Sequence, residues 1–433
     1  MKILFVSGEL IAGNLAYEMK KEGHDVKLYI GDKERLDCFD NMVNKTNNWQ
    51  EELEWVGKDG LIVFDDIGYG KVQDELGTNG YTVFGGCEEG DKLEMDREYA
   101  QKIFSEYGMD VEKSKDFTDY DEAIDYIKNH KCAWVLKQNT HASSLAYIGM
   151  MKNGEDIISI INNYKKYNKS DAVRKISLQK KVNGVEVAIA RYFNGKDWTS
   201  PVFVSFEHKP FFDKDIGPLT AEMGTLGWYD EDEKNKLFTE TLFKIKPYLE
   251  KINYRGYVDI NSIINKDRLI PLEATMRFGE PTNHLQNEIH LSHWADLLYA
   301  SAKGEKYILN HKNGYSVVVC IVIPPFPYRM NTDNYLKDVE ILFKDKLTEE
   351  EWKMINFEEV KFDNETKNYR VAGHEGYILY ITGTGDTVES ARKKAYHLIK
   401  KIVLPKMMYR TDIGLKFIKR DRRLLEKWGW IKK

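Results

Sequence analysis

The stretch Leu269-Ile-Pro-Leu-Glu-Ala-Thr-Met-Arg-Phe-Gly-Glu-Pro281 decides the fold of this chain, together with the run Tyr257-Val-Asp-Ile-Asn-Ser-Ile-Ile264 before it. Each is a short apolar run that carries acidic residues. The residues between them, Asn265–Arg268, are predicted to form a turn, so the two runs form neighbouring strands of a hairpin. Because side chains two positions apart share one face of a strand, the hairpin would hold Asp259 and Glu273 close together.

The polar side chains of this hairpin indicate phosphate chemistry. Two carboxylates and the Thr275 hydroxyl on one face are the hard oxygen ligands that Mg²⁺ needs when it bridges the phosphates of ATP. Arg277 is expected on the same face, where its fork of donors would stabilise a transferring phosphoryl group. The alternative is a surface hairpin with scattered charges, and the spacing alone leaves that alternative open.

Composition excludes several classes of protein. The 433 residues predict two to four domains, and 42% hydrophobic with 31% charged residues is typical of a soluble globular protein. A net charge of −5 gives no general footprint for nucleic acid, and no apolar run approaches the ~20 residues of a membrane span. The four cysteines form no CxxC pair, and no signal-peptide cleavage site follows the first strand. We therefore expect a cytoplasmic protein with free thiols.

Strands and helices alternate over residues 1–97. The predicted strands are Lys2–Val6, His24–Ile30, Leu61–Phe64 and Tyr81–Phe84, with a helix over Leu15–Lys21. This rhythm predicts a parallel sheet covered by helices. Such sheets bind ligands at the carboxyl ends of their strands, which here are Ser7-Gly8-Glu9 and Asp65-Asp66.

The middle of the chain supplies further candidates for phosphate binding. A helix is expected over Leu93–Tyr107 with Arg97 near its start, followed by a buried strand that ends in Lys137. That lysine could reach an α- or β-phosphate or could be a snorkelling surface side chain. The polar loop Gln138–Tyr147 is a possible flap over phosphates. Leu178–Ala190 predicts strand, turn and strand, with Glu186 just inside the second strand.

A loop rich in turn-forming residues follows. Glu207-His-Lys209 and Asp215–Thr225 are expected to hold a small substrate by backbone groups, with His208 as a structural hydrogen-bonding residue. Glu233–Ile252 predicts an amphipathic helix kinked at Pro247. His290 and His293 would share a helical face, but zinc needs a third protein ligand.

The last part of the chain predicts a small α/β domain. The polar run Lys303–Gly314 indicates a domain boundary, and Tyr315–Pro324 and Tyr377–Thr382 are expected strands. A helix should begin after Gly383-Thr-Gly, capped by Asp386 or Thr387.

These residues together resemble the ATP-grasp ligases, and most closely the glycinamide ribonucleotide synthetases (phosphoribosylamine–glycine ligases). That family carries Asp-His-Lys and Asp-Thr-Gly-Pro-Asn-Thr-Gly-Gly-Met-Gly where this chain has Glu207-His-Lys209 and Asp215 through Gly224. Its Glu-x-Asn-x-Arg-Phe-Gly-Asp-Pro-Glu corresponds to Glu273 through Thr282. Its Thr-x-x-Gly-Asp-Thr and Tyr-Arg-x-Asp-Ile-Gly recur as Thr382–Thr387 and Tyr409–Gly414. The resemblance covers almost the whole chain in the right order.

The resemblance implies an α/β architecture with three parts. These are an N-terminal Rossmann-like (pre-ATP-grasp) parallel-sheet domain over residues 1–97 that binds the acceptor, an ATP-grasp domain over 98–305 with its flap subdomain at about 112–190, and a C-terminal α/β domain over 306–433.

The resemblance also implies a reaction and its residues. ATP with Mg²⁺ (or Mn²⁺) phosphorylates a small carboxylate, glycine in the family, and an amine attacks the acyl phosphate to form an amide. The implied roles are catalysis by Arg277, Asp215 and Lys137; ATP binding by Arg97, Lys137, Ser143, Ser144, Glu186 and Lys209; substrate binding by Ser7, Gly8, Glu9, Asp215, Gly217, Thr220, Met223, Gly224, Arg277, Gly279 and Glu280; and metal binding by Asp259, Glu273 and Thr275.

Departures from the family bear on the substrate. The family's Gly-x-Gly-Gly-Arg-Glu-His-Ala-Leu, which helps to bind phosphoribosylamine, is replaced by Ser7-Gly-Glu-Leu-Ile-Ala-Gly-Asn-Leu15, and an acid beside a bound phosphate is unfavourable. The family's flap Gly-Leu-Ala-Ala-Gly-Lys-Gly has become Thr140–Ala146, and Gly-Gly before Met has become Ala221-Glu222. Arg97 stands in place of a lysine and Thr275 in place of an asparagine.

Three functions remain open from the sequence. The chain could be a ligase with an altered acceptor, such as a nucleoside, a nucleotide or another amino acid. It could retain the family's activity, which joins glycine to phosphoribosylamine. It could also be a non-catalytic nucleotide-binding or partner-binding homologue. The expected partners are small molecules, without a membrane, for a monomer or small homo-oligomer. The net charge does not favour nucleic acid, but the locally basic tail after Gly414 leaves that partner open.

Overall fold

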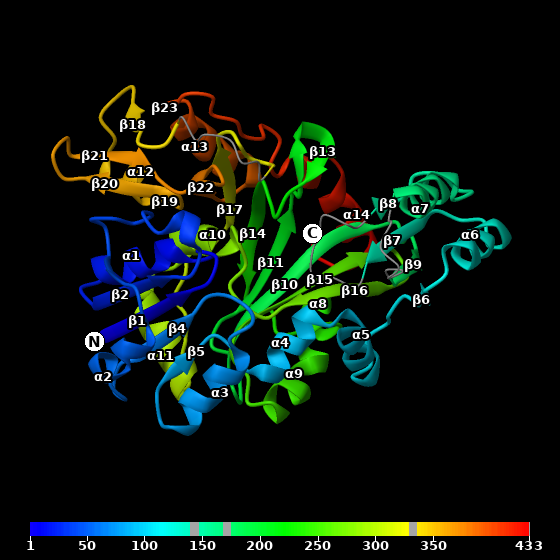
Figure 1. Cartoon of the computed structure of the whole chain (residues 1–433), viewed down its shortest axis with the longest axis horizontal. Coiled ribbons are helices and arrows are strands. Elements are labelled where there is room, and N and C mark those ends of the chain that lie inside the picture. Colours follow the sequence, from blue (N-terminus) through cyan, green and yellow to red (C-terminus); the bar gives the residue numbers. More distant parts are fainter. Residues whose placement is uncertain (139–146, 168–174, 329–335, 433) are drawn as a thin grey trace.

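The computed structural model describes residues 1–138, 147–167, 175–328 and 336–432. The N-terminal part is a parallel five-stranded sheet in the order β3-β2-β1-β4-β5 (Figure 1). Its strands are β1 (Lys2–Ser7), β2 (Asp25–Ile30), β3 (Asn44–Thr46), β4 (Leu61–Phe64) and β5 (Val83–Phe84), and its helices are α1 (Gly13–Lys21), α2 (Leu53–Val56) and α3 (Gly70–Thr78). This confirms the predicted parallel sheet, although β5 is shorter than Tyr81–Phe84.

A twisted antiparallel sheet forms the centre of the molecule, in the order β16-β15-β10-β11-β14-β17-β22-β19. Its strands are β10 (Val185–Asn194), β11 (Val202–Glu207), β14 (Gly224–Asp230), β15 (Arg255–Ile264), β16 (Leu269–Thr275), β17 (Tyr315–Val322), β19 (Ile355–Phe357) and β22 (Tyr377–Gly385). Nearly all of β10 and β15 is buried, so these strands form the rigid floor beneath the site.

The predicted hairpin is confirmed by the pairing of β15 with β16. Asn265 and Arg268 close the turn, where the Asn265 amide donates to the Arg268 carbonyl at 3.0 Å. The register pairs Asp259 with Thr275 and Asn261 with Glu273. These four side chains therefore share one face of the sheet.

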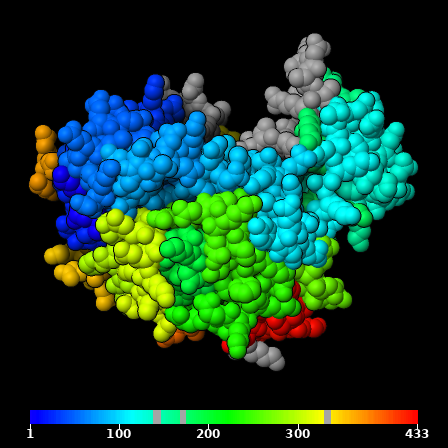
Figure 2. Space-filling model, turned by 90° about the horizontal axis from the view of Figure 1, so that it is seen from below, coloured from blue at the N-terminus to red at the C-terminus, as the bar shows by residue number. Residues whose placement is uncertain are grey.

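A separate lobe projects at one end of the molecule, where it is coloured cyan in Figures 1 and 2. Its antiparallel sheet has the order β6-β9-β7-β8 and its own small apolar core. The elements are β6 (Ser114–Phe117), α6 (Tyr120–Asn129), β7 (Trp134–Gln138), β8 (Tyr147–Ile148), α7 (Glu155–Tyr167) and β9 (Ile176–Lys180). The predicted flap loop between β7 and β8 lies outside the described residues.

Two predicted helices are broken differently from the expectation. The predicted helix Leu93–Tyr107 is divided between two helices, α4 (Glu88–Met95) and α5 (Arg97–Glu106). The division falls at Asp96, which leaves the helical conformation and caps α5 by accepting a hydrogen bond from the Tyr99 amide. The helix expected to kink at Pro247 is instead interrupted at Thr241, between α8 (Lys236–Thr239) and α9 (Leu242–Lys251).

The expectation that His290 and His293 share a helical face is wrong. His290 ends α10 (Thr282–Ile289) and His293 precedes α11 (Trp294–Lys303), and both have extended backbone. His290 is held by a hydrogen bond with the Tyr229 hydroxyl at 2.8 Å. Within the described residues there is no group of three or more His, Cys, Asp or Glu side chains that could by itself hold a metal ion.

The C-terminal part extends the central sheet. β17 pairs with β14 and β22 with β17, so the sheet continues across the predicted boundary near residue 305. The division into three domains remains a prediction. The other elements of this part are β18 (Glu340–Phe343), α12 (Glu349–Lys353), β20 (Val360–Asp363), β21 (Asn368–Val371), α13 (Val388–Ile399), β23 (Ile402–Val403), the π-helical turn Phe417–Asp421 and α14 (Arg422–Trp428).

The predicted start of α13 is confirmed. Thr387 caps the helix in a reciprocal capping box with Ser390, which satisfies two backbone amides at the helix start. Among the helices of the described residues, none has the length and apolarity to cross a bilayer.

Candidate functional site

A cleft of about 1190 Å³ runs between the N-terminal sheet, the projecting lobe and the central sheet. The predicted site residues in its wall are Glu9, Arg97, Lys137, Glu186, Lys209, Asp215, Thr220, Asp259, Glu273, Thr275, Arg277, Gly279 and Glu280. Residues from the first sheet, the lobe and the β15–β16 hairpin therefore meet around one cavity. Ser7, Gly8, Gly217, Met223 and Gly224 are not among the described residues that line it, and Ser143 and Ser144 lie outside the described residues.

Lys209 occupies a cage of carboxylates on the floor of the cleft. Its Nζ lies 3.0 Å from Glu207, 3.2 Å from Glu273 and 3.4 Å from Glu186. Burial alone would lower the pKa of Lys209, but these carboxylates raise it well above its usual value. The Lys209 ammonium in turn lowers the pKa of Glu273 to about 2. Both groups are therefore charged at neutral pH.

Two neighbouring side chains have free acceptor atoms. Asp259 and Asn261 are almost completely buried, and the Oδ1 atom of each has no hydrogen-bond partner among the residues that the structure describes. Burial and the nearby Glu207 raise the pKa of Asp259 well above its usual value. A buried acceptor without a partner is costly, so these oxygens indicate a place for a donor or a cation.

Asn261 is a candidate that the sequence analysis missed. It lies directly across from Glu273, and its Nδ2 donates to Glu207 Oε1 at 3.0 Å. The alternation Asp259-Ile-Asn261 could have identified it, because residues i and i+2 share a face. Glu207 and Glu222 are also in the cleft wall; both belong to the loop that was expected to hold a substrate through its backbone, but neither side chain was given a role.

The donor set fits a hard cation. Glu273, Asn261 and Thr275 supply carboxylate, amide and hydroxyl oxygens from two rigid strands, and Asp259 adds a second carboxylate. A Mg²⁺ ion usually keeps one or two protein carboxylates and completes its octahedron with water and substrate phosphates. The few protein oxygens here suit such a partly open site.

Two cations face this hairpin from the opposite wall. Lys137 lies near the end of β7, and burial, followed by the charge of Arg97, lowers its pKa to about 7. Arg97 begins α5, and its Nη2 donates to Gln179 Oε1 at 3.1 Å. Neither cation makes an ion pair of 4.0 Å or less within the described part of the chain. Both are thus available to an anionic ligand.

The cations at the N-terminal end of the cleft are already paired. Arg277 Nε lies 3.0 Å from Glu94 and 3.8 Å from Asp66. Arg35, which is buried, lies 2.6 Å from Glu358 and 3.2 Å from Glu359.

Further acids lie around this end. Glu9 and Glu280 belong to the wall, and Glu280 accepts a hydrogen bond from the Tyr380 hydroxyl. Asp65 accepts from the Ser7 hydroxyl at 2.7 Å and from the Ala12 amide at 2.8 Å, and its burial raises its pKa to about 7. Ser7 is therefore occupied within the N-terminal sheet.

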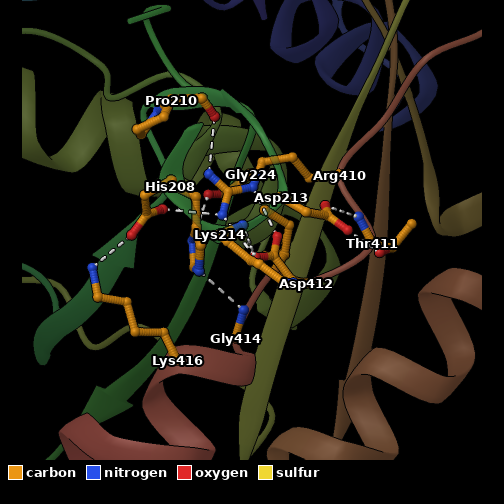
Figure 3. A network of polar contacts seen from close by, with 12 residues as sticks. His208, Pro210, Asp213, Lys214, Gly224, Arg410, Thr411, Asp412, Gly414 and Lys416 are labelled. Carbon is orange, nitrogen blue, oxygen red and sulfur yellow. Dashed lines mark hydrogen bonds and ion pairs between the residues drawn. The ribbon is translucent and has the colours of Figure 1, made fainter. Parts of the chain in front are cut away.

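The small hairpin of β12 (Pro210–Phe212) and β13 (Ile216–Leu219) contributes Pro210 and Leu219 to the wall of the cleft. Figure 1 shows where β13 lies in the fold. Asp215 stands at its tip, and Thr220 donates to the Lys209 carbonyl at 2.7 Å. Figure 3 shows the polar contacts around the hairpin.

His208 has the predicted structural role within this network. It is buried, its Nε2 accepts from the Gly414 amide at 3.2 Å, and its Nδ1 lies 3.2 Å from the Gly224 carbonyl. Burial lowers its pKa to about 4, so the ring is neutral at neutral pH.

Comparison with known proteins supports the same interpretation. Residues 95–283 match the family described as phosphoribosylglycinamide synthetase, ATP-grasp (A) domain, and residues 317–416 match the C domain of the same synthetase. The phosphoribosylamine–glycine ligase of Clostridium acetobutylicum is 25% identical over 441 residues, which cover 96% of this chain and 99% of that protein. The ligase of Fusobacterium nucleatum is 23% identical over 396 residues, or 88% of each chain.

Solved structures share the fold. The phosphoribosylamine–glycine ligase of Thermotoga maritima superposes with a TM-score of 0.72 at 20% identity, over 95% of this chain and 100% of that one. The biotin carboxylase domain of the Hydrogenobacter thermophilus 2-oxoglutarate carboxylase, solved with MgADP, has a TM-score of 0.64 at 14% identity, over 99% and 97% of the two chains. The chain is an ATP-grasp ligase, an enzyme of the class that forms C–N bonds. More narrowly, it is of the phosphoribosylglycinamide synthetase type, because its ATP-grasp and C-domain regions both match that family.

Proposed function

We propose that this enzyme uses ATP to join glycine or another small amino acid to an amine through an acyl phosphate, and that its amine acceptor differs from phosphoribosylamine. The observation that carries the first half is a pair of cations, Lys137 and Arg97, that have no ion-pair partner among the described residues and face the oxygen-rich β15–β16 hairpin across the cleft. A nucleotide phosphate chain needs both, cations for its oxygens and hard ligands for its metal.

The residues of the chain would divide the work as follows. Glu273, Asn261 and Thr275, with Asp259, would hold Mg²⁺ or Mn²⁺, which supplies charge neutralisation when ATP is bound. Lys137 and Arg97 would bind ATP phosphate oxygens, and Glu186, at the lobe side of the cage, would reach the ribose. Ser143 and Ser144 of the flap loop remain predicted ATP contacts.

Lys209 would change partners when nucleotide binds. Its ammonium occupies the space between Glu207 and Glu273 that a cation would claim. Its flexible stem would let the ammonium turn away from Glu273 and toward the transferred phosphoryl group.

The amino acid would lie between the hairpin tip and Arg277. Asp215 and Thr220 border that space from one side, with Gly279 and Glu280 on the other. Gly217, Met223 and Gly224 would act here through the backbone that shapes the loop. Arg277 would stabilise the transferred phosphoryl group once a ligand competes with Glu94 for its guanidinium.

The N-terminal end supports an altered acceptor. Phosphoribosylamine carries a phosphate, and in this chain Arg277 and Arg35 each neutralise carboxylates of the protein itself. Glu9 adds a negative charge to the wall beside Ser7 and Gly8. A phosphorylated acceptor would therefore meet repulsion, whereas a neutral or cationic amine would not.

The parent activity is the second candidate, because the matched relatives are phosphoribosylamine–glycine ligases over nearly their full length. The test is ADP release by the purified chain with ATP and Mg²⁺, with glycine and fresh phosphoribosylamine added singly and together. ADP and amide that form only when both substrates are present would support the phosphoribosylamine–glycine ligase activity of the relatives. Amide formation with other amines would support the altered acceptor, and a broad screen without product or isotope exchange would refute a ligase.

A further inference from the structure

The C-terminal motif Tyr409-Arg-Thr-Asp-Ile-Gly414 has no role in the proposed chemistry, yet it lies against the β12–β13 hairpin (Figure 3). Its residues make polar contacts with the tip of that hairpin and with Pro210 at the start of its first strand. The partners are about 200 residues apart in the sequence, so these contacts are purely tertiary.

The hairpin cannot support itself. Within the described part of the chain, β12 and β13 pair only with each other, through two register pairs separated by an irregularity. Phe212 and Ile216 are exposed, and Phe211, which packs against Phe326, is the one buried residue in the two strands, so little apolar burial holds them. The two residues at the tip, Lys214 and Asp215, both have the left-handed backbone with φ of 65° and 58°, which side chains other than glycine adopt at a cost. An isolated two-stranded hairpin of this kind is at most marginally stable.

Arg410 supplies much of the missing support. Its side chain is only 1% exposed, and its fork donates in three directions. Nη1 donates to the Pro210 carbonyl at 2.9 Å, Nη2 donates to Asp215 Oδ1 at 3.0 Å, and Nε donates to Asp412 Oδ1 at 2.8 Å. One guanidinium thus joins the first strand, the tip and its own segment.

The neighbours of Arg410 hold the tip of the hairpin, Asp213–Asp215. The Thr411 amide donates to Asp213 and the Lys214 amide donates to Asp412, both at 2.8 Å. Lys416 lies 2.9 Å from the second oxygen of Asp215. Both carboxylate oxygens of Asp215 are therefore held by the C-terminal segment.

We infer that Arg410 is a positioning residue that holds the β12–β13 hairpin, with Asp215 and Thr220, over the cleft. It acts through Asp215 and the Pro210 backbone. Because the Gly414 amide of the same segment binds His208 next to Lys209, the segment orders the hairpin and the adjoining cage together. The consequence for turnover rests on the proposed function, but the consequence for the hairpin does not.

The first test is hydrogen exchange of the full chain without ligand. Arg410→Lys keeps the positive charge and removes the fork, so we expect exchange of the amides in residues 211–220 to rise about tenfold or more while the central strands stay protected. Lys416→Met, which removes one exposed contact, should give a smaller rise in the same residues. Arg422→Met is the matched control, because Arg422 pairs with Glu426 on α14 and does not contact the hairpin.

Unchanged exchange at residues 211–220 in both Arg410→Lys and Lys416→Met would overturn the inference. If Arg410→Lys loosens the whole protein, Lys416→Met at the rim still decides the matter.

The second test is steady-state kinetics with an accepted amino acid. Arg410→Lys should raise the KM for the amino acid about tenfold and leave the KM for ATP within about twofold. An equal effect on both constants would point to a general structural role and would contradict positioning. If the unsubstituted protein turns over no substrate at all, the proposed function fails. Hydrogen exchange would still test whether Arg410 holds the β12–β13 hairpin.

Discussion

The two ends of the cleft differ in whether their cations are paired with carboxylates of the protein. At the lobe end, Lys137 and Arg97 have no carboxylate partner among the described residues, and burial with mutual repulsion lowers the pKa of Lys137 to about 7. At the N-terminal end, Arg277 and Arg35 are held by carboxylates of the chain.

This difference separates a site prepared for a polyanion from one that is not. Partial burial without an ion-pair partner disfavours the charged forms of Lys137 and Arg97, and bound phosphates would favour those forms again. The N-terminal end has already been neutralised, and further negative charge there gains little. The same cleft is therefore suited to ATP at one end and to an acceptor without a phosphate at the other.

The largest expected effect comes from replacing a proposed metal ligand at the lobe end of the cleft. Glu273→Gln removes a charge that would bind Mg²⁺ and a partner of Lys209, so we expect ATP-dependent product formation to fall by about 10³-fold or more. Asp267→Asn, on the exposed turn of the same hairpin, is the control and should keep full activity. Activity of Glu273→Gln within about threefold of the parent chain would show that the metal lies elsewhere.

A second prediction uses the pKa of Lys137. Its value near 7 lies below that of a free lysine, so at about pH 8.5 the amine is mostly neutral without ligand. Bound phosphate would raise this pKa, and ATP binding should therefore take up close to one proton. Calorimetric titration of ATP in two buffers of different ionisation enthalpy measures the uptake. Lys137→Met should abolish it, and proton release on binding to the parent chain would refute the assignment.

A third prediction tests whether negative charge at the N-terminal end of the cleft disfavours a phosphorylated acceptor. Glu9→Gln removes negative charge from the wall, so a phosphorylated amine should bind about three to ten times more tightly, whereas a neutral amine should be unaffected. The measurement is the KM for phosphoribosylamine in the ADP-release assay, with Glu34→Gln as an exposed control. Weaker binding of the phosphorylated amine would mean that Glu9 contacts it directly.

The smallest expected effect concerns how the contact between Asp412 and the β12–β13 hairpin contributes to stability at low pH. Arg410 and the Lys214 amide outweigh burial and lower the pKa of Asp412 to about 2. This depressed pKa stabilises the fold above the ordinary aspartate value of 3.8, and the contribution is lost as the pH falls toward 2. Urea unfolding of Asp412→Asn and the parent chain should differ by on the order of 1 kcal/mol near neutrality after solvent screening, and converge below about pH 3. A difference that grows in acid would contradict this sign.

Local sequence rules predicted much of the fold because the governing interactions are local. Short apolar runs and a turn between them predicted the β15–β16 hairpin, and a cap at Asp386 or Thr387 after Gly383-Thr-Gly predicted the start of α13. The break at Asp96 was missed, although an aspartate followed by helix formers is itself an N-cap signal. Pro247 proved compatible with an unbroken α9, and the interruption falls at Thr241 instead.

The sequence by itself determined which chemistry the chain carries: the carboxylates of one hairpin, a lysine at a strand end and an ordered set of motifs. Only the tertiary structure decided which cations are free and which are paired, because Arg35 meets Glu358 and Arg410 meets Asp215 across separations that no periodicity encodes. It also decided that Asn261 faces Glu273, since that depends on strand register. Local patterns set the backbone, but charge pairing depends on distances in space, and those exist only after the chain has folded.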